Sequence, residues 1–421
     1  MASKKLGLTG QILTGMFLGA IVGFILNKVG VQDTLIQSVF VDGVFRLMGD
    51  VFIASLMMLV VPLVFFSLVV GTSSLSDPAM LGRLGGKSIV LYLVTTAVAI
   101  SIALFVAVLI GPGEGVNLEK PAATAFTAAE APPFIEVLLN MVPRNPIAAM
   151  SEGNMLQIIV FALLFGVAIA LSGKPGERLK VVFEDINEVI MKLVVMLMYV
   201  APYGVFALMA RVFADLGLDM VQSLGWYFGT VFFILLFQGF VVYPVLLAAF
   251  TRLNPMLFLR KMMNVQVFAF SISSSNATIP VNLKNAEQRL GADNSVASFT
   301  IPLGATINMD GTAIMQGVAT VFISQIYGID LTMTQYLMVI GTATLASIGT
   351  AGVPGVGLIM LAMVLQQVGL PVEGIALIIG VDRLLDMTRT AVNVTGDSMV
   401  TTIIAKSEGK LDKDVYNNPN A

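Results

Sequence analysis

Long apolar segments recur along the first part of the chain, and each is long enough to cross a lipid bilayer. A spanning helix needs about 20 consecutive, mostly apolar residues. Several of the segments exceed one span, which favours tilted helices. The pattern predicts six membrane-spanning helices before residue 254, at residues 8–28, 44–71, 87–110, 147–171, 188–213 and 222–250.

The apolar pattern changes after residue 254. Residues 255–290 are apolar on both flanks, but FSISSSNATIP interrupts them at 270–280. Residues 334–369 are interrupted in the same way by SIGTAGVPGVG at 347–357. Serine, glycine and proline break a helix, and each half is too short to span. We therefore predict two re-entrant helical hairpins, which are tolerated only where their backbone lines a cavity in the protein.

A longer apolar segment follows each hairpin, at 294–327 and at 372–405. The unit of hairpin and helix thus occurs twice, and a pair of broken segments is the best sequence indicator of a transporter binding site near the bilayer midplane. The complete pattern predicts an all-α integral membrane protein. It has eight transmembrane helices and two re-entrant helical hairpins, arranged as inverted repeats.

Composition supports a membrane protein and narrows its chemistry. Hydrophobic residues make up 57% of the 421 residues and charged residues 12%, where a soluble domain carries about 25% charge. The chain has no cysteine and no histidine. These absences exclude disulfides, thiolate and imidazole metal sites, and hydrolases that use a Ser-His or Cys-His pair. We expect no organic cofactor and no nucleic-acid partner.

Lysine and arginine predict the orientation of the chain. With the basic N-terminus inside, the alternation of spans places the basic clusters near 83–87, 174–180 and 252–261 on the same side. The acidic loop 111–146 then lies outside. We expect a multi-pass protein of the cell (inner) membrane, with cytoplasmic N- and C-termini. The tail after Lys410 is expected to be a loose end.

The last apolar segment carries ionisable side chains on one face. At about 100° per residue, Asp382, Asp386, Arg389, Asn393 and Asp397 fall within an arc of roughly 80°. A charge inside the bilayer costs at least a few kcal/mol, so it usually faces a cavity and marks a pathway. The stripe therefore predicts the wall of a binding site.

Chemistry suggests a role for each group on this stripe. The planar guanidinium of Arg389 suits a carboxylate, and Asp386 could hold an ammonium. The alternative is an Asp386–Arg389 ion pair that only locks helices together. Asp397 with Asn393 forms an oxygen-rich site that suits a cation. Arg383 points about 100° away from the stripe and receives no role.

Three further motifs place polar residues inside apolar segments. ISSSN (272–276) offers amides and hydroxyls that could cradle a carboxylate at a hairpin tip, unless it is a serine-rich loop between domains. NMDGT (308–312) breaks a helix and offers the oxygen ligands of a hard cation such as sodium; the alternative is a kinked helix with Asp310 bonded to a neighbour. SIGTAGVPG (347–355) is either a mobile gate or a static turn.

An enzyme is disfavoured. A serine nucleophile in ISSSN would need a base, but the chain has no histidine and Lys284 is the nearest lysine. We therefore expect no intramembrane hydrolase and no catalytic residues.

These four motifs, in this order, resemble those of the dicarboxylate/amino acid:cation symporter family, the glutamate transporters. The resemblance covers essentially the whole chain. It implies a homotrimer in which each transport domain moves like an elevator against a rigid scaffold. It further implies mainly scaffold and trimerisation helices in 1–72 and 133–250, the third helix and exposed loop in 73–132, the core of the transport domain in 255–408 and a cytoplasmic tail in 409–421.

The resemblance also implies site residues. Asp386 would take the amino group of the substrate, and Arg389 its side-chain carboxylate. The implied substrate-binding residues are Ser274, Ser275, Thr312, Val353, Gly357, Asp386, Arg389, Thr390 and Asn393. About three sodium sites are implied, formed by Asp397 with Gly304, Asn308 and Asn393; by Thr306 with Ser347, Ile348 and Thr350; and by Asp310 and Asn308 with Tyr92, Thr95 and Thr96.

Family variation bears on the substrate. Relatives for neutral amino acids lack an arginine at the position of Arg389, and relatives for C4-dicarboxylates lack the acids matching Asp386 and Asp397. This chain keeps all three, which favours sodium-driven symport of aspartate or glutamate, with residues 347–357 as the gate. A second arginine of many relatives is missing at Ser273 and Met387, which puts potassium counter-transport in doubt.

The charges predict coupling to cations. Asp310, Asp386 and Asp397 against Arg389 leave about two uncompensated negative charges, which are costly in a low dielectric. Bound cations would neutralise them, and the gate would close favourably only over a loaded site. The remaining alternatives are a proton-coupled or C4-dicarboxylate carrier of the same family and, from another class, an anion channel.

Overall fold

The computed structural model describes residues 8–30, 35–73, 84–115, 142–216, 219–348 and 355–418. The named elements in these ranges are all helices. The first part comprises α1 (Leu8–Val29), the π-helix η1 (Gln37–Phe45), α2 (Arg46–Ser73), α4 (Gly86–Ile110), α6 (Pro146–Glu152), α7 (Met155–Leu171), α8 (Lys174–Leu216), α9 (Asp219–Phe237), the π-helix η3 (Gln238–Val242) and α10 (Tyr243–Thr251).

The second part holds the interrupted segments and the polar helix. It comprises α11 (Pro255–Ile272), α12 (Ser275–Gln288), α13 (Asn294–Ile307), α14 (Asp310–Ile326), α15 (Met333–Ser347), α16 (Val356–Gln367), the 3-10 helix η4 (Val372–Gly374), α17 (Ile375–Ser407) and α18 (Lys413–Asn417).

The predicted helices are confirmed over most of their length, with two exceptions. The single helix predicted for 147–171 is wrong. Gly153 ends α6 in the left-handed conformation, at φ 71°, and the side chain of Asn154 caps the start of α7. The helix predicted at 188–213 begins earlier, at Lys174, and its two halves meet at an angle of 46° near the proline at 202.

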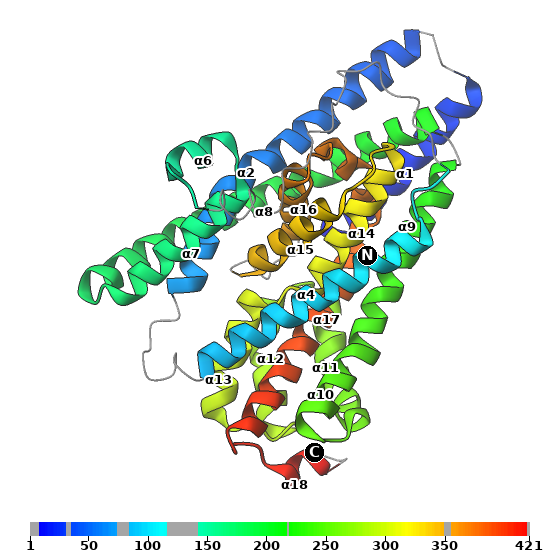
Figure 1. Cartoon of the computed structure of the whole chain (residues 1–421). Coiled ribbons are helices and arrows are strands. Elements are labelled where there is room, and N and C mark those ends of the chain that lie inside the picture. Colours follow the sequence, from blue (N-terminus) through cyan, green and yellow to red (C-terminus); the bar gives the residue numbers. More distant parts are fainter. Residues whose placement is uncertain are drawn as a thin grey trace, which may run out of the picture.

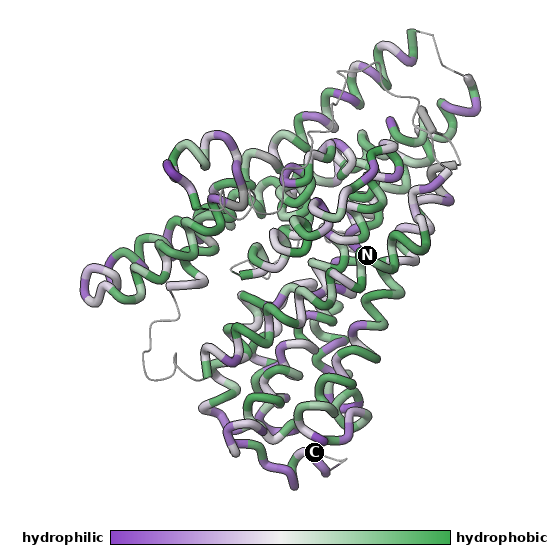
Figure 2. Tube along the Cα trace, viewed as in Figure 1, coloured by the Kyte–Doolittle hydropathy of each residue, from purple (hydrophilic) through white to green (hydrophobic). Residues whose placement is uncertain are grey.

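Within the described ranges, four helices are long and apolar enough to cross a membrane, and the bent α8 makes a fifth. Their large apolar side chains include many that are exposed, as lipid contact requires; Phe105 and Phe233 are 66% and 56% exposed. Figure 2 shows the apolar colour along most of these helices and hydrophilic residues at the end near α18. The count of eight spans stays a prediction.

Both interrupted segments form a helix, a break and a second helix, as predicted. The first break is short, because Ser273 turns the chain with φ at 55° and Ser274 caps α12 by accepting a hydrogen bond from the amide of Ala277. In the second, α15 and α16 flank residues 349–354, which lie outside the described residues together with the predicted ligands Thr350 and Val353. The helix break predicted at NMDGT is confirmed at 308–309.

The helices pack in two groups (Figure 1). α1 and α2 pack mainly against α8, and α7 packs mainly against α2, whereas α17 is surrounded by α9 to α14. Residues 222–250, which we grouped with the scaffold, form α9 and α10 and pack against α14 and α17. The assignment of scaffold and transport domain stays a prediction.

Glycines let α1 approach α8 closely. Gly15, Gly19 and Gly23 recur every four residues on one face of α1, and a Cβ added at any of them would collide with a backbone carbonyl of α8. Small residues at this spacing allow helix backbones to approach within the membrane. The contact between α1 and α8 therefore depends on these three glycines.

Replacing Gly19 with alanine is expected to destabilise the protein by about 1–3 kcal/mol, because the new methyl group overpacks the interface. Gly229→Ala is the matched control, since Gly229 lies in helix α9 with no neighbour within 4 Å of the added Cβ. Alanine there should be neutral or stabilise by up to about 1 kcal/mol. Chemical unfolding in micelles measures both; equal effects would contradict the role of the glycine.

The tail after Lys410 is not loose over its described part. Tyr416 is fully buried, and its hydroxyl donates to the carbonyl of Asn254 at 2.9 Å. Lys261 of α11 donates to the carbonyls of Arg289, Val415 and Tyr416 at 2.6–2.9 Å. The prediction of a loose end was therefore wrong for residues 411–418, because a buried ammonium needs acceptors and the tail supplies two of them.

Candidate functional site

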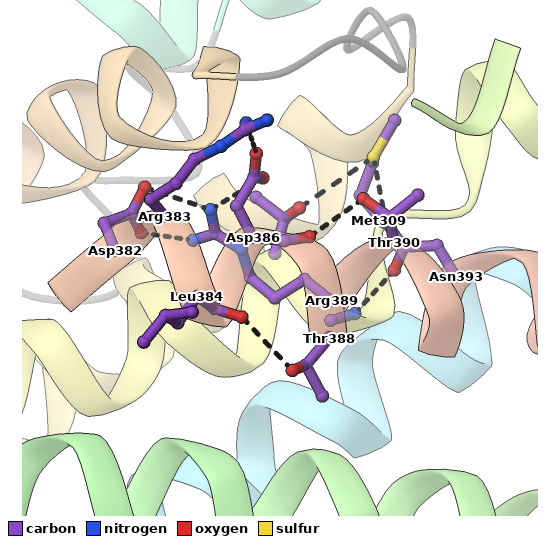
Figure 3. A network of polar contacts seen from close by, with 11 residues as sticks. Met309, Asp382, Arg383, Leu384, Asp386, Thr388, Arg389, Thr390 and Asn393 are labelled. Carbon is purple, nitrogen blue, oxygen red and sulfur yellow. Dashed lines mark hydrogen bonds and ion pairs between the residues drawn. The ribbon is translucent and has the colours of Figure 1, made fainter. Parts of the chain in front are cut away.

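Three charged side chains of α17 form a compact cluster, drawn in Figure 3. Arg389 lies 2.9 Å from Asp382, between Nη1 and Oδ1, and 2.9 Å from Asp386, between Nη2 and Oδ1. The guanidinium is 1% exposed. The i, i+3 and i, i+7 spacing brings these groups onto one face, as the helical period predicts. The ion pair between Asp386 and Arg389, which we considered as an alternative, is thus present.

Arg383 joins the same cluster. Its Nη1 lies 3.2 Å from Oδ2 of Asp386, the carboxylate oxygen that Arg389 leaves open. The expectation that Arg383 points away from the stripe was wrong, because its long side chain reaches back to a residue one turn along the helix. The cluster therefore holds two carboxylates and two guanidiniums and is neutral.

A small cavity of 30 Å³ adjoins the cluster. Asp382, Arg383 and Asp386 form its polar side, and apolar residues of α1, α2 and α8 such as Phe52 and Val205 form the opposite side. A water needs about 10–15 Å³, so the cavity has room for about two waters. A larger ligand needs movement of the surrounding helices or exchange of an ion-pair partner.

The predicted pocket residues lie on the elements around this cluster. Gly357 of α16 borders the guanidinium, since a Cβ there would lie 3.3 Å from Nη2 of Arg389. Thr390 is buried and donates to the carbonyl of Asp386 at 2.9 Å. Ser274, Ser275 and Thr312 are also buried, the two serines at the start of α12 and Thr312 in the first turn of α14.

Asp310 is fully buried at the start of α14 and accepts hydrogen bonds from four side chains. Thr96 and Thr95 of α4 donate to Oδ1 at 2.6 and 3.3 Å, and their predicted role as ion ligands stays a prediction. Tyr243 and Gln238 donate to Oδ2 at 2.8 and 3.4 Å. Among the described residues, the ion pairs do not include Asp310.

Tyr92 of α4 lies between the two buried carboxylates, and its role as an ion ligand stays a prediction. Its hydroxyl donates to the carbonyl of Thr300 at 3.0 Å rather than to Asp310. A Cβ on Gly304 would lie 2.6 Å from this hydroxyl and 2.5 Å from Oδ1 of Asp397. Tyr92 therefore borders the surroundings of Asp397 as well, and only glycine fits between the two groups.

Asp397 and Asn308 form the second buried oxygen cluster. Asn308 Nδ2 donates to Asp397 Oδ1 and to the carbonyl of Asn393, each at 2.9 Å. Asn308 Oδ1 is buried and has no hydrogen-bond partner in the described part of the chain. The C-terminal end of α13, where backbone carbonyls carry partial negative charge, lies beside them. Such a set of oxygens suits a cation.

Asn393 connects the cluster around Asp397, through its backbone carbonyl, with the start of α14, through its side chain. Its Oδ1 accepts the amide hydrogen of Gly311 at 2.8 Å, at the N-terminus of α14. Thr306 and Ser347 instead donate to carbonyls of their own helices, α13 and α15, at 3.1 and 2.7 Å. The amide of Ile348 likewise donates to the carbonyl of Leu345. The described contacts do not bring Thr306 and Ser347 together, so this third predicted site stays a prediction.

Sequence reasoning missed three members of these clusters. Gln238 and Tyr243 lie in an apolar segment, and nothing near them in the sequence indicates that they contact Asp310. Arg383 could have been found, because it precedes Asp386 by three residues, a spacing at which opposite charges pair on a helix. Asp382 was recognised on the stripe but not as a partner of Arg389.

Comparison with known proteins decides the family. The profile described as the sodium:dicarboxylate symporter family matches residues 8–407. The chain belongs to this family. The resemblance seen in the four motifs is thereby confirmed, and the helical fold with its apolar helices agrees with a family of membrane transporters.

Relatives in the sodium:dicarboxylate symporter family carry different substrates and ions. The chain is 36% identical to the proton/glutamate-aspartate symporter of Escherichia coli, over 98% of this chain and 95% of the relative. It is 34% identical to the proton/sodium-glutamate symport protein of Geobacillus stearothermophilus, over 98% and 97%. It is 33% identical to the C4-dicarboxylate transport protein of Bacillus subtilis, over 96% and 94%.

Proposed function

We propose that this chain is a sodium-driven symporter of aspartate or glutamate. The observation that carries the proposal is a pair of buried carboxylates, Asp310 and Asp397, that stand outside the ion pairs of the described residues. A buried carboxylate without a cationic partner is costly. Cargo cations that bind beside these groups would remove that cost, and hydroxyl, amide and carbonyl oxygens surround both.

The charges account for coupled movement. The four-member cluster of Arg383, Asp386, Arg389 and Asp382 is neutral, so Asp310 and Asp397 leave two negative charges. An acidic amino acid adds one more negative charge. About three sodium ions would therefore neutralise the loaded site, whereas substrate or ions alone would leave net charge in a low dielectric. By this count the empty site carries two negative charges and the fully loaded site is neutral, so the fully loaded protein would cross the membrane at the lowest cost.

Arg389 and Asp386 are the proposed contacts of the substrate. Arg389 would bind its side-chain carboxylate and Asp386 its amino group, with Gly357 leaving space beside the guanidinium. Each substrate group must exchange for an internal partner, because both side chains are already paired. The same proposal includes closure of residues 347–357, elevator movement of the transport domain and assembly as a homotrimer, and the family resemblance supports them.

Uptake into liposomes tests the proposal. Purified protein, an imposed sodium gradient and labelled aspartate, glutamate and succinate form the assay. Aspartate or glutamate should accumulate only with the sodium gradient, and unlabelled succinate should compete weakly. Uptake that is unchanged in sodium-free buffer, or single-channel currents without substrate, would contradict sodium symport.

A proton-coupled carrier is the second candidate, and one contact favours it. The amide of Gln238 donates to Asp310 at a long 3.4 Å, while its Oε1 has no hydrogen-bond partner among the described residues. Turned over, this amide would offer an acceptor to a protonated Asp310. Uptake driven by a proton gradient in sodium-free buffer would favour this candidate.

A further inference from the structure

Two arginines share one carboxylate at the cavity. Arg389 holds Oδ1 of Asp386 at 2.9 Å, and Arg383 holds Oδ2 at 3.2 Å. Figure 3 shows the two guanidiniums approaching Asp386 from different sides. Arg389 is also held in place by its ion pair with Asp382. The side chain of Arg383 is 15% exposed, against 1% for Arg389, and it borders the cavity. Arg383 is therefore the exchangeable partner of Asp386.

We propose that Arg383 is a specificity-determining residue that occupies the ammonium position on Asp386. The inference rests on the proposed function and concerns the same site. An amino acid brings its own ammonium, which replaces the guanidinium at Oδ2 and leaves Asp386 neutralised. A C4-dicarboxylate brings no cation, so Asp386 must keep Arg383 while that substrate is bound. Arg383 thus competes with the ammonium of an amino acid for Asp386 and favours the binding of dicarboxylates.

Removal of Arg383 should shift the preference toward aspartate for two reasons, the lost competition for Asp386 and the lost positive charge. Removal of Arg383 frees Oδ2 of Asp386 for a substrate ammonium, which strengthens binding of aspartate. The same removal leaves Asp386 with less positive charge beside a dicarboxylate of charge −2, which weakens binding of succinate. A charge-assisted hydrogen bond contributes about 1.5–3 kcal/mol, which corresponds to at least about a tenfold change in affinity. A purely structural ion pair would alter both affinities alike.

Competition measurements on Arg383→Gln test the proposal. Unlabelled aspartate and succinate compete with labelled substrate in liposomes, and the ratio of their half-inhibitory concentrations is compared with that of the wild type. In the variant, the preference for aspartate over succinate should rise at least about tenfold. Arg383→Lys keeps a cation near Asp386 and should stay within about threefold of the wild type. Arg46→Gln, which removes an exposed guanidinium paired with Asp50, is the matched control.

Several outcomes would overturn the inference. An unchanged ratio in Arg383→Gln, or the same change in Arg383→Lys and in the control, would do so. If Arg383→Gln gives no uptake, the shift in unfolding temperature caused by aspartate and by succinate replaces the competition assay. An equal loss of both shifts would show that the role of Arg383 is structural alone. The proposed function fails separately, if the wild type shows no sodium-driven uptake of acidic amino acids, because ligand-induced shifts do not require transport.

Discussion

Arg389→Met is expected to abolish uptake of acidic amino acids and to destabilise the protein by about 3–5 kcal/mol, because it leaves buried carboxylates without their partner. Asp382 loses its ion pair, and Asp386 keeps only Arg383. Uptake should fall at least about 100-fold, since the substrate carboxylate loses its bidentate partner. Liposome uptake and chemical unfolding in micelles measure the two effects.

Two further variants separate binding from stability. Asp382→Asn combined with Arg389→Met removes one uncompensated charge, so it should recover part of the stability but none of the uptake. Arg389→Lys keeps the charge but not the planar fork, and it should fold well and transport poorly. Wild-type uptake in Arg389→Met would refute the role of this arginine, whatever its stability.

Asp310→Asn is expected to raise the sodium concentration for half-maximal uptake at least about 100-fold, because a cation loses its buried anionic partner, which is worth about 3–5 kcal/mol. In the unchanged protein, Thr96 and Tyr243 donate to the carboxylate of Asp310 at 2.6 and 2.8 Å. The amide group of the asparagine would present hydrogen-bond donors to these two donors. Uptake at a series of sodium concentrations, at constant ionic strength, gives the measurement.

The neighbours of Asp310 supply graded controls. Thr96→Val removes the donor at 2.6 Å and should weaken sodium dependence more than Thr95→Val, whose donor lies at 3.3 Å. Sodium dependence that survives Asp310→Asn, together with lost dependence on pH, would reassign this site to a proton. Unchanged dependence on both ions would show that Asp310 binds neither.

Local features of the chain predicted most of the helices. A spanning helix depends on a run of apolar residues, and a break depends on serine, glycine or asparagine at one place, so both can be recognised from neighbouring residues. The break before Asp310 and the turn at Ser273 were predicted on this basis. The split at Gly153 was missed because a single Gly-Asn pair interrupts an otherwise apolar segment.

The polar stripe of α17 could be derived without a structure, whereas the partners of its charges could not. Helical periodicity alone places Asp382, Asp386 and Arg389 on one face, because the rotation per residue is constant. The donors to Asp310 come from α4, η3 and α10, and Tyr243 lies 67 residues away in the chain. Such contacts arise when distant helices pack together, and the identity of neighbouring residues does not encode that packing.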